Sequence, residues 1–230
     1  MTRQTQPELN GFLTDLRTEW LFPDTVLLTA RYHVDLYHHD LHAISGIPLP
    51  DRLGKAVTKR RAEFLAGRLL ARQGQTALGC KPRTVPIAAN RAPVWPDGIT
   101  GSLTHAKSQC AALVSTNTDR TLGIDCEAIA NGTSLTAIRS QTLTITDLGW
   151  ISSPYEATCL FSAKETLFKA LFPQVNRVFG FSAAELTAAI GPDTLSLQLT
   201  ENLTDTLVAG TGFTITHRQW ETHVLTWLAR

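Results

Sequence analysis

Residues 122–127 read LGIDCE, a stretch that decides the fold because apolar and acidic side chains alternate along it. Such alternation is typical of a β-strand, whose successive side chains point to opposite faces of a sheet. We therefore expect the apolar residues to face a core and Asp125 and Glu127 to project together from the other face, about 7 Å apart. Two carboxylates directed at one point favour a hard divalent cation such as Mg²⁺. By itself, the pattern also fits an ordinary half-exposed strand.

A long amphipathic helix is predicted over residues 155–172, and Pro173 is expected to end it. At about 100° per residue, Lys164 lies in the middle of the apolar arc of this helix, so its charge needs a partner. Glu165 lies at the edge of the same arc, and Lys169 follows it four positions later, near enough for the two to pair or to meet one ligand. A solvated Glu–Lys pair on an exposed face is the alternative interpretation.

Another amphipathic helix is predicted over residues 52–73, after a connection rich in proline. Arg60 and Arg68 are eight positions apart, about 12 Å along the helix axis and roughly 80° around it. Both guanidinium groups can therefore reach toward one elongated polyanion, and their planar forks suit phosphate oxygens. A solvated basic face explains the same residues without a ligand.

Short runs of apolar residues separated by polar turns predict a meander of strands in the middle of the chain. A strand is expected to begin near Thr25, and the others are expected over residues 99–105, 110–115, 121–127, 195–199 and 213–216. Within the meander, Thr104 and His105 could contact a phosphate or a nucleotide edge, although a lone histidine is more often structural.

The composition excludes several classes of protein. The chain has 230 residues, 43% of them hydrophobic and 18% charged, so it can bury a core and is not disordered. No apolar run is long enough for a transmembrane helix, and residues 1–10 are polar rather than typical of a signal peptide, so we expect a cytoplasmic protein. Four cysteines stand far apart without a C-x-x-C pair, which indicates small buried hydrophobes rather than a zinc or redox site.

Charge is distributed unevenly along the chain. Residues 1–115 carry 14 Lys and Arg against nine acidic residues, whereas residues 116–230 carry seven against eleven. This excess is too small for a nucleic-acid-binding domain, but an arginine cluster beside carboxylates suits a phosphorylated ligand held partly through a divalent metal. Two ordinary surfaces that differ in charge are the alternative. With a polar break at residues 116–119, we expect two domains, residues 1–117 and 118–230.

Four motifs follow one another along residues 49–172: RRAEFLAGR, WPDGITGSLTH, GIDCE and FSAKETLFKAL. Together they resemble the 4′-phosphopantetheinyl transferases of the larger surfactin/enterobactin-synthase class. The enterobactin-synthase component D branch is the closer match because of FLAGR and of WPxG before GSxxH. The resemblance implies an α/β (α+β) fold in which two similar subdomains form a pseudo-dimer within one monomer, with the cofactor between them.

The resemblance also implies an activity. Such enzymes transfer the 4′-phosphopantetheine arm of coenzyme A to a serine of an apo acyl, peptidyl or aryl carrier protein and release adenosine 3′,5′-bisphosphate. Mg²⁺ is the implied metal, and the pathways served include nonribosomal peptide, polyketide and siderophore synthesis. No nucleic acid or membrane is an expected partner. An acidic helix of the carrier would meet the basic half of the chain.

Residue roles are carried over from the family by motif. The metal ligands would be Asp125, Glu127 and Glu165, and the catalytic residues would be Glu165, Lys169 and Asp125. The contacts to coenzyme A would be Arg60, Arg68, Arg91, Thr104, His105, Lys164 and Lys169. Among them, His105 would face the 3′-phosphate, and Lys164 would support the site or help proton transfer. Glu165, acting through a water on the metal, is the first candidate for the general base, and Asp147 is the second.

Other interpretations remain open from the sequence. A non-catalytic protein that binds coenzyme A or a nucleotide would keep the arginine helix, but the intact acid set speaks against it. A zinc site could use the histidines His33, His38, His39 and His42. No G-x-S-x-G motif supports a hydrolase. Ala106 stands where the family often has cysteine, and the stretch between Glu127 and Tyr155 resembles little, which leaves the choice of carrier undetermined.

Overall fold

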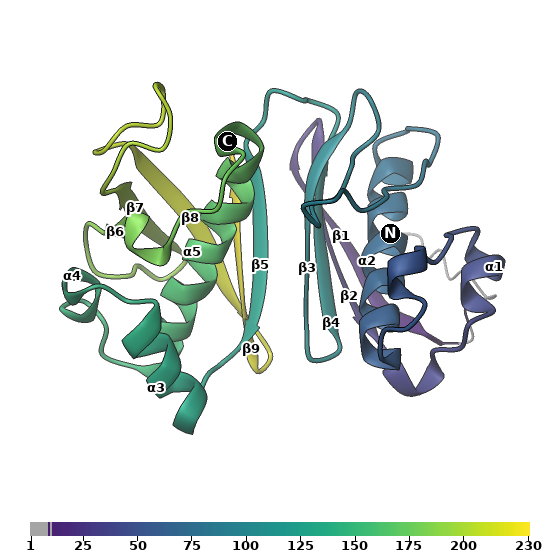
Figure 1. Cartoon of the computed structure of the whole chain (residues 1–230), viewed down its shortest axis with the longest axis horizontal. Helices are drawn as coiled ribbons and strands as arrows, with labels where there is room; N and C mark the ends of the chain where they lie inside the picture. Colours follow the sequence, from purple (N-terminus) through teal and green to yellow (C-terminus); the bar gives the residue numbers. More distant parts are fainter. Residues whose placement is uncertain (1–8, 10) are drawn as a thin grey trace. The chain divides into compact units, whose positions relative to one another are not determined.

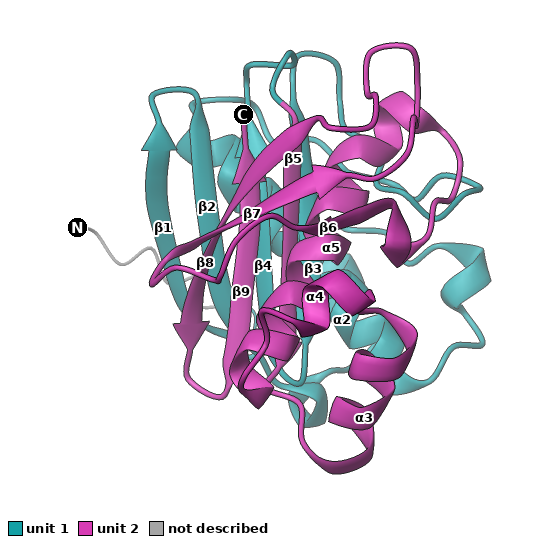
Figure 2. Ribbon diagram, turned by 90° about the vertical axis from the view of Figure 1, so that its left-hand side faces the viewer, with its two compact units in different colours: residues 1–120 teal, residues 121–230 magenta. Residues whose placement is uncertain are grey.

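The computed structural model describes residue 9 and residues 11–230, and the chain divides after Arg120 into two compact units (Figure 2). The expectation based on the polar residues 1–10 lies outside the described residues, apart from Leu9. In the described part of the chain, no helix has the length and apolar character needed to cross a membrane. Each unit combines a sheet with helices, so the α/β fold class is confirmed.

The first unit contains an antiparallel sheet of four strands in the order β1-β2-β4-β3. The long helix α2 packs against β2 and β4 (Figure 1). Apolar side chains of the helix and of these strands form one core beneath it. The elements of this unit are β1 (Leu13–Phe22), β2 (Thr25–Tyr32), α1 (Leu41–Ser45), α2 (Thr58–Ala77), β3 (Thr100–Ala106), β4 (Gln109–Ser115) and two short 3-10 helices (Val34–Leu36 and Asp51–Leu53).

Helix α2 begins and ends later than residues 52–73. Asp51–Leu53 form a separate 3-10 helix between Pro50 and Gly54, and α2 begins only at Thr58. The helix continues past Gly74, where an added Cβ would lie 2.5 Å from Val114 Cγ2. Glycine therefore does not end this helix but allows its last turns to lie close against β4.

The second unit contains an antiparallel sheet of five strands in the order β5-β9-β8-β7-β6. Helix α5 lies along β5 and β9 (Figure 1), and the shorter helix α3 packs against α5. The elements of this unit are β5 (Leu122–Ala128), α3 (Gly132–Gln141), α4 (Ile145–Leu148), α5 (Pro154–Val175), a 3-10 helix (Phe181–Ala183), β6 (Ala184–Leu186), β7 (Thr194–Leu199), β8 (Gly212–Trp220) and β9 (His223–Ala229).

Local sequence explains both ends of α5. Ser153 and Glu156 form a capping box at its N-terminus, which satisfies backbone N–H groups that the helix itself cannot. The expectation that Pro173 ends the helix was wrong, because α5 runs through it to Val175. A proline so near the end removes only one backbone hydrogen bond, and the chain turns out of the helix at Asn176, whose φ is 49°.

All four cysteines are free thiols. Three of them are buried as expected, and burial raises the pKa of Cys159 to about 12. Cys80 is only partly buried, contrary to the expectation, because it follows the end of α2.

Candidate functional site

Asp125 lies on the face of β5 that α5 covers. The Ser162 hydroxyl donates to its Oδ2 at 2.8 Å, and Lys169 Nζ donates to its Oδ1 at 2.7 Å. The side chain is only 5% exposed. The expectation that the acidic face of this strand lies outside the core was therefore wrong at Asp125. Its apolar neighbours Ile124 and Cys126 are buried as well, so both faces of the strand are covered at this point.

Gly123 allows α5 to approach β5 closely enough for these contacts. A Cβ at Gly123 would overlap the carbonyl oxygen of Thr166 and would lie 2.9 Å from Ala170 Cβ. Strand and helix therefore touch backbone to backbone, two residues before Asp125. This contact places Asp125 directly below the helix turn that carries Ser162 and Glu165.

Glu165 is the second carboxylate at this place. Burial and the negative charge of Asp125 raise the pKa of Glu165, against a smaller lowering by Lys169. Asp125 and Glu165 are thus within electrostatic reach of each other. Glu127 lies two positions further along β5 and is half-buried.

The donor set suits Mg²⁺, which prefers carboxylate oxygens. Asp125 and Glu165 come from different elements and lie within electrostatic reach of each other, and Glu127 projects from the same strand face as Asp125. No group of three His, Cys, Asp or Glu side chains within residues 9 and 11–230 is close enough to hold an ion as the structure stands. The structure therefore brings together two of the three expected metal ligands.

Lys169 connects this carboxylate pair to the backbone. Its Nζ donates to the carbonyl oxygen of Ile124 at 3.1 Å and to Asp125 Oδ1, and its side chain is 29% exposed. Two of its three N–H groups are used in these bonds, and the third can meet an anionic ligand. The charge of Lys169 also partly offsets the two acids.

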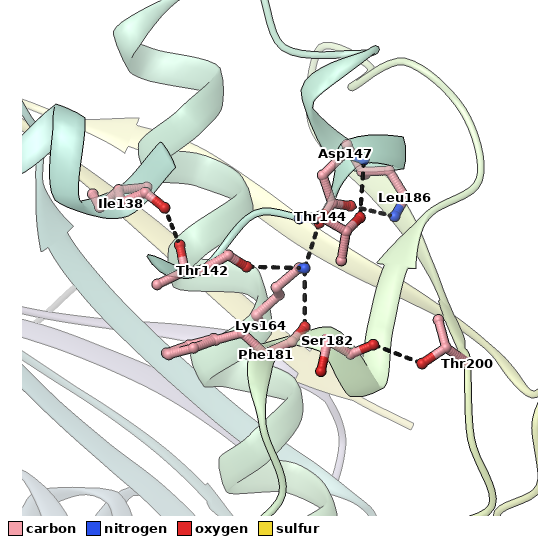
Figure 3. Close-up of polar contacts among 9 residues, drawn as sticks. All are labelled: Ile138, Thr142, Thr144, Asp147, Lys164, Phe181, Ser182, Leu186 and Thr200. Carbon is pink, nitrogen blue, oxygen red and sulfur yellow. Dashed lines mark hydrogen bonds and ion pairs between the residues drawn. The ribbon is translucent and has the colours of Figure 1, made fainter. Parts of the chain in front are cut away.

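Lys164 has a different environment, although it is the neighbour of Glu165. Its ammonium donates to Asp147 Oδ2 and to the carbonyl oxygens of Thr142 and Phe181 (Figure 3). These three bonds use all three of its N–H groups. The contacts favour the supporting role of the two expected for Lys164.

Asp147 completes this network and is fully buried. Besides Lys164, its carboxylate accepts the backbone N–H groups of Thr144 and Leu186. It therefore ties α4 and β6 to α5, as Figure 3 shows. A carboxylate enclosed in this way does not reach a substrate hydroxyl, so Asp147 is not a candidate for the general base.

A basic cluster lies in the first unit, at the N-terminal end of α2. Arg60 Nη1 donates to His105 Nε2 at 3.0 Å and to Glu63 Oε2 at 3.2 Å. Arg60 is half exposed and His105 is one third exposed. The structure thus brings together two of the residues expected to contact coenzyme A, which come from α2 and β3.

Arg68 lies two turns further along α2. Its Nε donates to the carbonyl oxygen of Val85, and its guanidinium lies 4.6 Å from the centre of the Phe64 ring. Burial, Arg60 and Arg52 together lower the pKa of Arg68 to about 10. Three arginines therefore gather here. Sequence reasoning placed Arg52 at the start of the predicted helix and gave it no role, whereas the structure places it in a separate 3-10 helix.

Arg91 and Thr104, two further residues expected to contact coenzyme A, differ in their environments. Arg91 is exposed in a turn and has a φ of 72°, and its N–H donates to the carbonyl oxygen of Ala88. That carbonyl also accepts from Arg52, so this turn and the arginine cluster are linked. Thr104 is buried in β3, one position before His105.

Zinc binding by the four histidines finds no support. His42 is buried, with Nδ1 bonded to the carbonyl oxygen of Ile47 and Nε2 bonded to the Tyr37 hydroxyl. Both ring nitrogens are therefore engaged. His38 lies outside helix α1, so the expected pairing of His38 and His42 on one helix does not form. Among the described residues, these histidines do not form a metal site.

An α/β protein with an arginine–histidine cluster and a carboxylate pair, of which Asp125 is buried, beside a lysine has the features of an enzyme that acts on a phosphorylated substrate. A family model described as the 4′-phosphopantetheinyl transferase N-terminal domain matches residues 49–115.

Relatives that match over most of the chain agree with this result. Enterobactin synthase component D of Salmonella typhimurium is 32% identical over 180 residues, which cover 70% of this chain and 74% of that protein. The 4′-phosphopantetheinyl transferase PptT of Mycobacterium tuberculosis is 36% identical over 177 residues, which cover 70% and 75%. The 4′-phosphopantetheinyl transferase Npt of Nocardia iowensis is 35% identical over 146 residues, which cover 60% and 64%. The chain therefore belongs to the 4′-phosphopantetheinyl transferase family and is a transferase enzyme.

Proposed function

We propose that this enzyme transfers the 4′-phosphopantetheine arm of coenzyme A to a serine of an apo carrier protein and releases adenosine 3′,5′-bisphosphate. Its family supports the proposal, because relatives are named as 4′-phosphopantetheinyl transferases. The observation that carries it is Asp125, held by Ser162 and Lys169 beside Glu165. Two neighbouring carboxylates next to a lysine suit the binding of a metal–diphosphate group.

In the proposed site, Asp125, Glu127 and Glu165 would be the residues that hold Mg²⁺. The ion would supply positive charge to the phosphate oxygens. Lys169 donates its remaining N–H to the diphosphate of coenzyme A. Because Asp125, Glu165 and Lys169 lie on β5 and α5, which touch backbone to backbone, these three groups are held near one another before the substrate arrives, and the Glu127 carboxylate would turn toward them to complete the site.

The reaction is a displacement at phosphorus. The serine oxygen of the carrier forms a bond to the phosphorus that carries the pantetheine arm, and the bond from that phosphorus to the bridging oxygen breaks. Adenosine 3′,5′-bisphosphate leaves with the electron pair, and the serine proton passes to a base, for which Glu165 is our candidate. Positioning and electrostatic stabilisation supply most of the rate.

The nucleotide half of coenzyme A is assigned to the first unit. Arg60 and Arg68 grip its phosphates, with Arg91 as a further basic contact, and Thr104 and His105 contact the nucleotide, with His105 toward the 3′-phosphate. Support comes from the bond between Arg60 and His105 and from the electrostatic coupling of Arg60 and Arg68. Guanidinium groups suit phosphate because they bind two oxygens at once.

The protein partner is an apo carrier domain of acyl, peptidyl or aryl type. Residues 1–115 carry five more basic than acidic residues, which would attract an acidic carrier helix and mainly raise the association rate. We further propose that the enzyme acts as a cytoplasmic monomer.

Mass spectrometry of carriers tests the proposal. The enzyme is incubated with coenzyme A, Mg²⁺ and a panel of apo acyl, peptidyl and aryl carriers, and each carrier is weighed for the added arm. We expect transfer to at least one carrier and its loss when EDTA removes divalent ions. Absence of transfer to every carrier, each accepted by another phosphopantetheinyl transferase, contradicts the proposal.

The variant Asp125→Ala tests the site itself. We expect it to abolish transfer, because the central carboxylate is lost, while the far-ultraviolet circular dichroism spectrum stays that of the parent. Asp125→Asn is the matched shape control, since it can still accept a hydrogen bond from Ser162 but lacks the charge. Near-normal turnover by either folded variant contradicts the assignment of Asp125.

A further inference from the structure

Glu63 is a buried carboxylate that neither the motif roles nor the proposed reaction uses. Its side chain is only 10% exposed, yet three basic side chains surround it. Arg60 Nη1 lies 3.2 Å from Oε2, His105 Nδ1 lies 3.7 Å from Oε1, and Lys59 Nζ lies 4.0 Å from Oε1.

Lys59 and Arg60 both carry positive charge and would repel each other without this acid. Lys59 and Arg60 stand in the first turn of α2, which contains no acidic residue, and the dipole of the helix adds further positive charge there. A carboxylate in the following turn offsets that charge and holds the side chains in one place. Basic residues in the first turn of a helix are unfavourable because of the helix dipole, and side chains that break such a local rule often serve a ligand.

The hydrogen bonds also fix the orientation of His105. Arg60 Nη1 lies 3.0 Å from Nε2, and Nδ1 faces Glu63 Oε1 at 3.7 Å, so both ring nitrogens are directed at members of the cluster. Glu63 thus contacts both members of the Arg60–His105 pair. The pair is assembled from two different elements, α2 and β3, with Glu63 as their common partner.

We infer that Glu63 is a positioning residue that holds Arg60 and His105 together as a preformed acceptor for a phosphate monoester dianion, namely the 3′-phosphate of coenzyme A. This inference rests on the proposed function. Glu63 itself does not touch the ligand, since two anions would repel each other; it acts through its two basic partners.

The test compares ligands with and without that phosphate. Calorimetry measures the binding of adenosine 3′,5′-bisphosphate and of adenosine 5′-monophosphate to the parent and to Glu63→Gln, and transfer assays compare the KM of coenzyme A with that of 3′-dephospho-coenzyme A. We expect Glu63→Gln to weaken the ligands that carry the 3′-phosphate roughly tenfold, as is typical when a charge-assisted hydrogen bond is lost. Ligands without it should change less than twofold, and kcat should stay near the parent value.

Glu19→Gln is the matched control, because it removes one negative charge from an exposed position on β1 of the same unit. It should bind all ligands as the parent does. His105→Gln should lose the same preference for the 3′-phosphate, and the double variant Glu63→Gln/His105→Gln should lose little more than either alone.

The outcomes separate this inference from the proposed function. The role of Glu63 is overturned if Glu63→Gln weakens both kinds of ligand equally, or if its preference for the 3′-phosphate is unchanged. In either case, transfer of the arm by the parent enzyme still supports the proposed function. A parent that transfers no arm but prefers the bisphosphate in a Glu63-dependent manner overturns the function and keeps the inference. If Glu63→Gln has a lowered melting temperature, the double variant decides the matter: losses of 3′-phosphate preference that add up in Glu63→Gln/His105→Gln overturn the role of Glu63.

Discussion

Removing the carboxylate of Asp147 should destabilise the second unit strongly. The ion pair with Lys164 is buried, with side-chain exposures of 0% and 2%. Removing one partner of such a pair lowers the unfolding free energy by about 3–5 kcal/mol, because the other charge stays buried without its partner. Asp147→Ala should also leave the N–H groups of Thr144 and Leu186 without their acceptor. We therefore expect a loss near the upper end of this range.

Urea unfolding followed by circular dichroism measures this loss. For a unit of this size, a loss of about 4 kcal/mol corresponds to a fall in melting temperature of roughly 15 °C or more. Asp205→Asn, an exposed acidic residue of the same unit, is the control and should stay within about 0.5 kcal/mol of the parent.

A double-mutant cycle with Lys164→Met isolates the pair. The double variant Asp147→Ala/Lys164→Met should lose less unfolding free energy than the sum of the two single losses, since no buried charge is left unpaired. Folded Lys164→Met should keep the parent KM for coenzyme A within a factor of two, because the lysine supports the fold. Additive losses in the cycle, or a large rise in KM without loss of stability, would refute this reasoning.

Two further predictions concern stability. Gly123→Ala should lower the unfolding free energy, measured with urea, by several kcal/mol, because the new methyl group overlaps the carbonyl oxygen of Thr166. A loss below about 1 kcal/mol would show that the helix and the strand separate easily. Burial lowers the pKa of His42 and of His217, so the unfolded chain, with a histidine pKa near 6.5, takes up protons first as the pH falls. The unfolding free energy should therefore be highest above pH 6.5 and fall between pH 6.5 and pH 5, and the slope should be shallower in His42→Gln/His217→Gln; an equal slope in both proteins would rule out these histidines as its source.

Much of the fold could be predicted from periodicity. Alternation predicted the strand around Asp125, and helical spacing predicted both long helices within a few residues. The ends of α2 and α5 were predicted wrongly, because Gly74 and Pro173 were taken as local stop signals. Contacts with β4 and the position of the proline in the last turns decided those ends instead.

The site was predictable in its residue types but less so in its contacts. The apolar arc indicated that Lys164 needs a partner, but only the fold identifies Asp147, seventeen positions away. Glu63 gave a signal that was missed: it lies on the same helical face as Ala66 and Leu70, which are buried, so an acid there required a basic partner. Strand alternation alone could not tell which face of β5 the helix would cover.

The contact at Gly123 has a consequence for protein engineering. Since main-chain atoms of α5 and β5 set the separation of Asp125 and Glu165, exchanging surrounding core residues for larger or smaller ones will leave that separation almost unchanged. Any side chain at position 123 would instead push the whole helix outward, together with Ser162, Glu165 and Lys169. A designer who wishes to alter what the two acids bind must therefore change the liganding atoms and leave the packing alone.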